Sequence, residues 1–169
     1  MRYLMILILV SMVAVLSCTP APKAEAEDGP IETSENLPLD AAYEPGTWIE
    51  NWDMALKTAQ ETGRTVLVNF TGSDWCSWCI RLSGEVFTKK EFQVYAAENL
   101  VLLKLDFPRN IAQSPELKKQ NNDLQRQFEI QGYPTIVLVD AEGKEIGRTG
   151  YREGGAIPYV QHLQEIIAP

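Results

Sequence analysis

Two cysteines, Cys76 and Cys79, stand three positions apart directly after an apolar run at residues 65–70. The run predicts a strand buried on both faces, so the cysteines fall on the first turn of a following helix, on one side of it. Thiolates are stabilised there by the unpaired backbone N–H groups and the helix dipole. The pattern predicts one disulfide that forms and breaks. Cys76 is the attacking thiolate, and Cys79 is the resolving thiol that expels a bound partner from a mixed disulfide.

A Cys-x-x-Cys pair also serves as a structural cross-link or as half of a metal site. A cross-link over so short a loop removes little chain entropy from the unfolded state, which argues against a purely structural role. A zinc or copper site needs more ligands than two sulfurs, and the only histidine, His162, falls in the last predicted helix, where we expect a structural role. We therefore expect no metal and no cofactor other than the redox-active disulfide of Cys76 and Cys79.

The first residues have the character of an export signal. Arg2 precedes an apolar stretch at residues 4–16 that is too short to span a bilayer as a helix, so residues 1–17 are predicted to be a signal peptide. The stretch closes in Val-Leu-Ser-Cys, which resembles the bacterial lipobox, whose cysteine is acylated and becomes the new N-terminus. We expect lipidation at Cys18; the alternative is an ordinary signal peptide that leaves Cys18 as a free thiol.

Composition separates a tether from a folded domain. Residues 19–45 contain five prolines, seven acidic residues and one lysine, with too few apolar side chains to offset the entropy of ordering them. We expect residues 18–47 to form a lipid-anchored, disordered tether and residues 48–169 to form one domain long enough for a hydrophobic core. The formal net charge of −8 argues against a nucleic-acid partner.

Hydrophobic periodicity and turn residues divide the folded part into alternating helices and strands. The predicted helices are residues 48–62, 76–97 with a bend near residues 83–84, 115–128 and 156–167, and the predicted strands are residues 65–71, 100–105, 135–139 and 145–151. The early alternation favours parallel pairing, whereas the tight turn at Glu142 and Gly143 makes the last two strands antiparallel. The expected architecture is an α/β fold with a central mixed sheet and helices on both faces.

This order of elements resembles the thioredoxin family over residues 48–167. Trp75 stands directly before the cysteine pair, and Gly-Tyr-Pro-Thr at residues 132–135 stands before a buried strand, as in that family. The segments at residues 70–76 and 102–106 look like the thioredoxin-like proteins related to the C-terminal domain of periplasmic thiol:disulfide interchange reductases. The resemblance implies a thioredoxin-like fold and disulfide exchange.

The resemblance also implies roles for residues around the cysteines. Pro134 is expected to be cis beside the disulfide, where it exposes backbone for strand-like pairing with a partner; a trans turn proline is the alternative. Tyr133 is expected to touch the partner and Trp75 to cover one side of the thiols. Trp78 replaces the proline common in thioredoxins and is expected to shape partner choice. Asn69 stands where thioredoxins carry a buried carboxylate that helps to take the proton of the resolving thiol, and an amide is no base, which favours a specialised partner.

These features together predict a membrane-tethered thiol–disulfide oxidoreductase of the cell envelope, facing the periplasm or the exterior and working in the reducing direction. Its expected partners are protein thiols and disulfides, together with a membrane electron donor or acceptor, and the chain is expected to be a monomer. Within the enzymes, a disulfide isomerase or oxidase is the alternative. Outside them, the alternative is a redox-gated copper-binding module that holds the metal for delivery.

Overall fold

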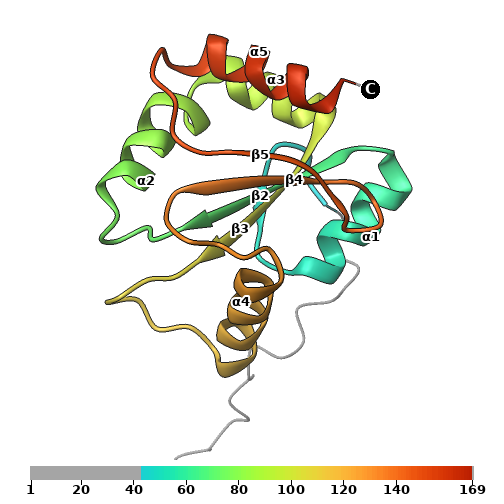
Figure 1. Ribbon diagram of the computed structural model, residues 1–169. Helices are drawn as coiled ribbons and strands as arrows, with labels where there is room; N and C mark the ends of the chain where they lie inside the picture. The colour runs from blue at the N-terminus through green and yellow to red at the C-terminus, as the bar shows by residue number, and fades with distance from the viewer. Residues whose placement is uncertain (1–42, 169) are drawn as a thin grey trace, which may run out of the picture. The chain divides into compact units, whose positions relative to one another are not determined.

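The strand that leads into the cysteines, β2 (Thr65–Thr71), lies at the centre of a five-stranded sheet. The computed structural model describes residues 43–168, and within them the strand order is β1-β3-β2-β4-β5 (Figure 1). The other strands are β1 (Trp48–Ile49), β3 (Leu100–Asp106), β4 (Thr135–Val139) and β5 (Glu145–Thr149). β3 pairs in parallel with β1 and β2, whereas β4 is antiparallel to β2 and β5, so the expected mixed sheet is confirmed.

Helices cover both faces of the sheet (Figure 1). On one face lie α1 (Trp52–Thr62) and α4 (Pro115–Gln127). On the other lie α2 (Ser77–Leu82), the π-helical turn η2 (Ser83–Phe87), α3 (Lys90–Asn99) and α5 (Ala156–Ile167).

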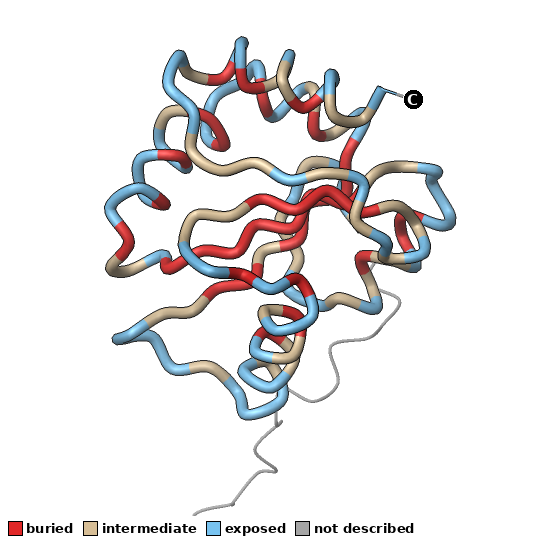
Figure 2. Tube along the Cα trace, in the orientation of Figure 1, coloured by how far each residue is buried: buried red, intermediate tan, exposed pale blue. Residues whose placement is uncertain are grey.

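Side chains of β2 alternate between these two layers. Val66, Val68 and Phe70 pack toward α1 and α4. Leu67 packs in the opposite layer, with residues of α2, α3 and α5, and Asn69 faces the same way. The buried residues concentrate along the central strands (Figure 2). The strand is therefore enclosed on both faces, and its end is a fixed point from which the cysteines extend.

Local signals in the sequence account for the helix ends next to the sheet. Asn51 precedes α1, and its side-chain oxygen accepts a hydrogen bond from the Met54 backbone N–H at 2.8 Å. The same helix ends at Gly63, whose φ of 68° is the left-handed conformation that favours glycine. Ser114 precedes α4, and its Oγ accepts from the Leu117 N–H at 3.1 Å. These caps satisfy backbone donors and acceptors that the helices leave unpaired.

The predicted start of the first helix is wrong. Trp48 and Ile49 form the edge strand β1, opposite Leu102 and Leu103 of β3, and the helix begins only after the Asn51 cap. Apolar residues at helical spacing continue through the strand, so periodicity alone did not separate the two elements. The pairing with β3 is a long-range contact that overrides the local pattern.

The predicted helix at residues 76–97 is three elements rather than one. The Thr88 backbone N–H donates to the Ser83 carbonyl at 3.0 Å, which is the wider spacing of a π-turn. Lys89 is extended, with φ of −85° and ψ of 143°, and separates this turn from α3. The chain therefore changes direction after the predicted bend. β5 is also shorter than predicted and ends at Thr149.

Replacing Leu103 by Ala is expected to lower the free energy of unfolding by about 2–5 kcal/mol, because it removes buried methyl groups from the layer under α1 and α4. Ile157→Ala is the matched control. Ile157 is 59% exposed on α5, so its replacement should change the same free energy by less than about 0.5 kcal/mol. Urea unfolding followed by tryptophan fluorescence measures both variants. Equal losses would contradict the placement of β3 in the core.

Candidate active site

Cys76 and Cys79 form a disulfide at the start of α2, directly beyond the end of β2. Cys76 is the N-cap residue of the helix, and its Sγ accepts a hydrogen bond from the Cys79 backbone N–H at 3.2 Å. An N–H group aimed at this sulfur favours a thiolate on Cys76. The two residues are only 7% and 4% exposed, so little of either one is open to a partner in the disulfide form.

The loop before the cysteines is held by the end of β3. Asp106 accepts hydrogen bonds from the Ser73 backbone N–H at 2.9 Å and from Ser73 Oγ at 2.5 Å. The Trp75 indole N–H donates to the Phe107 carbonyl at 2.8 Å. A Cβ on Gly72 would come within 2.5 Å of the Trp75 ring, so glycine is needed for this ring position. Both the backbone and the indole of the loop are therefore fixed by the neighbouring strand.

The segment after β3 makes a second set of contacts to the same loop. Asp74 accepts hydrogen bonds from the backbone N–H groups of Arg109 at 3.0 Å and Asn110 at 2.6 Å. The hydrogen bond from Arg109 is the main reason that the pKa of Asp74 is lowered. The Arg109 guanidinium lies 4.0 Å from the centre of the Trp75 ring, a cation–π contact. The sequence analysis did not predict the contacts of Asp106 or of the segment that follows it. A signal was present, because Asp106 ends a strand parallel to β2 and therefore has to lie next to the cysteine loop.

Pro134 lies beside the disulfide loop because of the register of β4. Thr135, the next residue, is paired with Phe70 near the end of β2. The peptide bond between Tyr133 and Pro134 is cis. The proline therefore borders the end of the strand from which Cys76 extends.

The Tyr133 side chain is engaged inside the protein. Its ring lies 5.9 Å from the Trp75 ring in an edge-on arrangement and 5.2 Å from the Phe107 ring. Its hydroxyl accepts a hydrogen bond from Gln125 Nε2 at 2.6 Å, and burial is the main cause that raises the pKa of Tyr133. Tyr133 thus supports Trp75 from the side of α4, a contact that sequence reasoning did not identify.

Trp78 forms an exposed aromatic surface next to the cysteines. The residue is 50% exposed, and its ring lies 5.0 Å from that of Tyr151. The Arg81 guanidinium lies within 5.4 Å of both ring centres and pairs with Glu85 at 2.7 Å. The Tyr151 hydroxyl donates to the same Glu85 carboxylate at 2.7 Å. The pKa of Glu85 is lowered, first by the hydrogen bond from Arg81 and then by the one from Tyr151. Arg81 and Glu85 therefore neutralise each other beside the site and hold the two rings together.

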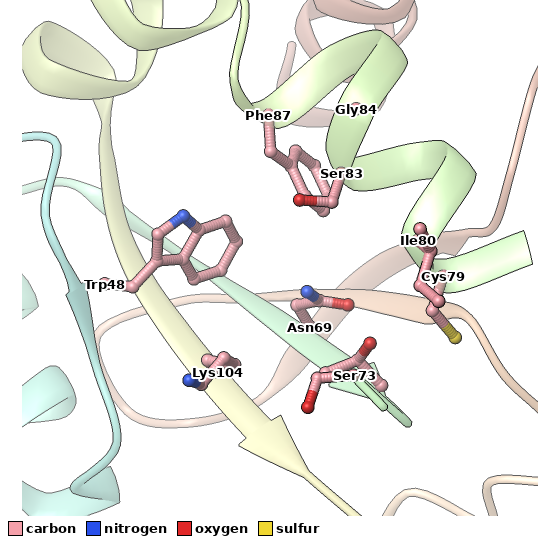
Figure 3. Close-up of a pocket in the computed structure, with 10 residues that line it drawn as sticks. Trp48, Asn69, Ser73, Cys79, Ile80, Ser83, Gly84, Phe87 and Lys104 are labelled. Carbon is pink, nitrogen blue, oxygen red and sulfur yellow. The ribbon is translucent and has the colours of Figure 1, made fainter. Parts of the chain in front are cut away.

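Asn69 lies behind the disulfide, at the predicted position in the strand. Together with Cys79 and Lys104 it lines a pocket of about 400 Å³ (Figure 3). The Lys104 ammonium pairs with Glu50 at 2.9 Å. Asn69 is therefore an amide that shares this pocket with a lysine that already has a carboxylate partner.

Other predicted features lie away from this site. His162 Nε2 is 3.0 Å from Thr149 Oγ1, a contact between α5 and β5. Within residues 43–168, no three His, Cys, Asp or Glu side chains are grouped closely enough to hold a metal ion. No helix in that same range is long and apolar enough to cross a membrane. The predicted signal peptide, Cys18 and most of the predicted tether lie outside the described residues.

Comparison with known proteins gives consistent matches. A family model for the thioredoxin-like domain matches residues 52–157. The chain is 33% identical over 118 residues to the disulfide bond reductase DsbH of Chlamydia pneumoniae, and the match covers 70% of this chain and 71% of that protein. It is 31% identical over 123 residues to the thiol:disulfide interchange protein DsbD of Pseudoalteromonas atlantica, where the match covers 70% of this chain but only 19% of DsbD.

A solved structure agrees with these sequence matches. The structure of a DsbH oxidoreductase superposes on this one with a TM-score of 0.69 at 32% identity, covering 80% of this chain and 94% of that one. The family model spans more than half of the 169 residues. The mixed sheet, the disulfide at the start of α2 and the matches therefore agree, and the chain belongs to the thioredoxin-like family of thiol–disulfide oxidoreductases.

Proposed function

We propose that this protein reduces disulfides in partner proteins of the bacterial cell envelope, with Cys76 as nucleophile and Cys79 as resolving thiol. The hydrogen bond from the Cys79 N–H to Cys76 Sγ carries this assignment, because it stabilises negative charge on one sulfur of the pair. The reducing direction is supported by the similarity to DsbH, which is named a disulfide bond reductase.

The proposed reaction has two exchange steps. The Cys76 thiolate attacks one sulfur of the partner disulfide, so a mixed disulfide forms and the other partner sulfur leaves as a thiolate. Cys79 then loses its proton and attacks Cys76 Sγ, which forms the Cys76–Cys79 bond and releases the second partner sulfur. Two electrons pass from the dithiol to the partner, and a membrane electron donor has to restore the dithiol. No metal or organic cofactor takes part in these steps.

The surroundings of the sulfurs support an extended partner segment. The backbone next to Pro134 lies at the end of β4, beside the disulfide loop, where a strand-like segment can pair. Trp78 supplies an exposed apolar surface next to the cysteines, and its ring is held by Tyr151 and Arg81. An extended segment with an apolar side chain next to its cysteine fits this arrangement.

The sequence supports a place at a membrane. In this proposal residues 1–17 direct export, Cys18 is acylated, and residues 18–47 hold the domain away from the membrane surface as a tether. The tether joins the domain at Tyr43, which packs against the core and whose hydroxyl donates to the Leu100 carbonyl at 3.3 Å. The domain, residues 48–169, then faces the periplasm or the exterior as a monomer.

Cys79→Ala is expected to accumulate covalent adducts with envelope proteins, because the mixed disulfide on Cys76 forms but is not resolved. Cys76→Ala should give almost none, and the double variant is the background control. Non-reducing electrophoresis of the full chain, expressed in its native envelope and trapped with acid, measures the adducts. Equal amounts in the two single variants would contradict the assignment of roles.

Gly72→Ala is expected to slow insulin reduction by about ten- to a hundredfold, because the added Cβ displaces the Trp75 ring that lies against the cysteine loop. Gly84→Ala is the matched control, since a Cβ there meets open space. The rate of insulin precipitation with dithiothreitol as donor measures both, and tryptophan fluorescence reports the ring. A normal rate in Gly72→Ala would show that the position of Trp75 is unimportant for exchange.

Cys18→Ser is expected to move the protein from the membrane fraction to the soluble fraction, because acylation is proposed to be its attachment. The native chain should incorporate radiolabelled palmitate, whereas Cys18→Ser should not. Cys76→Ser serves as the control and should remain labelled and membrane-bound. Unchanged fractionation and labelling of Cys18→Ser would refute the lipid anchor and leave the exchange chemistry unaffected.

A further inference from the structure

The pocket behind the disulfide is lined by one of the two cysteines, Cys79, and not by Cys76. Its volume is about 400 Å³, and it lies between β2, β3 and the segment formed by α2 and η2 (Figure 3). Cys79 forms part of its wall, whereas Cys76 does not line it. The polar side chains around it are Asn69, Thr71, Ser73, Ser83 and Lys104. The polar groups of the pocket are therefore placed to interact with Cys79 rather than with Cys76.

Asn69 brings an unpaired oxygen into this pocket. The residue is 8% exposed, and within residues 43–168 its Oδ1 has no hydrogen-bond partner. Figure 3 shows the side chain projecting from β2 into the pocket, with the oxygen on the side where Cys79 lies. A buried acceptor without a donor is unfavourable. The disulfide form therefore contains a polar group that a new donor would satisfy.

Two neighbouring polar groups are already engaged. Ser73 Oγ donates to Asp106 at 2.5 Å, and the Lys104 ammonium is 2.9 Å from Glu50. An ammonium group also has no lone pair with which to accept a hydrogen bond. Ser73 Oγ can still accept a hydrogen bond but belongs to an exposed residue, so of these three side chains Asn69 is the one whose acceptor is buried and without a partner.

The two sulfurs differ in what surrounds them once the disulfide is reduced. Cys76 Sγ has the Cys79 backbone N–H as a donor, which suits a thiolate. Cys79 is 4% exposed and lines the pocket, and no hydrogen-bond donor within residues 43–168 is directed at its sulfur as the Cys79 N–H is at Cys76 Sγ. A thiol is a weak donor that needs an acceptor. Breaking the S–S bond allows the Cys79 side chain to rotate toward the pocket, where that acceptor is present.

We propose that Asn69 Oδ1 accepts a hydrogen bond from the reduced Cys79 thiol and thereby favours the dithiol over the disulfide. Reduction breaks the S–S bond, and the two electrons and two protons come from a donor dithiol that becomes a disulfide. One of the two protons then lies on Cys79 Sγ, directed at Asn69. Asn69 is a positioning residue here, because it acts through Cys79. The inference rests on the proposed function, in which Cys76 and Cys79 alternate between the disulfide and the dithiol.

The first test is the redox equilibrium of the full chain with reduced and oxidised glutathione. Asn69→Leu keeps a similar volume and removes the acceptor, so the equilibrium constant should shift about tenfold toward the disulfide, which corresponds to a potential about 30 mV more negative. Thr71→Val is the matched control, because it removes a hydroxyl from the same strand and pocket, and its constant should stay within about twofold of the native value. No shift in Asn69→Leu, or an equal shift in both, would overturn the proposal.

The second test observes the hydrogen bond without relying on the stability of the Leu variant. In the Cys76→Ser chain, the infrared S–H stretching band of Cys79 is isolated by subtracting the spectrum of Cys76→Ser/Cys79→Ser. The band should lie at the lower frequency of a hydrogen-bonded thiol and should move to higher frequency when Asn69→Ala is added. A band at the free-thiol frequency in the presence of Asn69 would overturn the proposal.

The two proposals fail in different ways. If the Cys79→Ala chain traps no partners but Asn69→Leu still shifts the glutathione equilibrium, the proposed function is wrong and the role of Asn69 stands. If trapping occurs and neither the equilibrium nor the S–H band responds to residue 69, the hydrogen bond is wrong and the proposed function stands.

Discussion

The register between β2 and β3 determines where the groups of the active site stand. The two strands pair in parallel over seven residues, from Thr65 opposite Leu100 to Thr71 opposite Asp106, and both are buried between layers of helices. A slip of one residue would exchange the side chains that face the two helical layers, and it would place Asn69 in the apolar layer under α1 and α4, so the core enforces this register. Parallel strands end at the same edge of the sheet, which places Asp106 next to the cysteine loop and the segment after it next to Trp75. The rigidity of the site is therefore a consequence of packing far from the sulfurs.

The features that sequence reasoning predicted correctly depend on short stretches of chain. The uninterrupted apolar run of β2 indicated a strand buried on both faces, and Gly63 marked the end of the helix before it. The spacing of Cys76 and Cys79 indicated two side chains on the first turn of a helix, and the tight turn at residues 142–143 indicated an antiparallel pair. Each of these signals is contained in a few neighbouring residues, so no knowledge of the tertiary structure was needed.

The features that were missed join residues far apart in the chain. Trp48 pairs with a residue of β3, so an apparent helical turn became a strand. Asp74 is bonded to the backbone at Arg109, and the Tyr133 hydroxyl to Gln125, and neither partner follows from spacing or composition. The pocket behind Asn69 exists only once β2, β3 and α2 are assembled. The sequence identified the reactive atoms, whereas the groups that orient them emerge from the packing of separate elements.

The π-turn between α2 and α3 makes the cysteine-bearing helix a separable unit. A π-turn contains one residue more than an α-helical turn. The extra residue rotates the chain after the turn by about 100° relative to the chain before it. Leu82 before this turn and Phe92 after it are both fully buried, so each side of the turn is anchored to the core on its own. The π-turn itself contributes Val86 and Phe87 to the same core, so it joins two anchored segments that differ in direction. The turn that bears the cysteines is therefore held to the sheet by its own buried side chains and does not depend on α3 for its position.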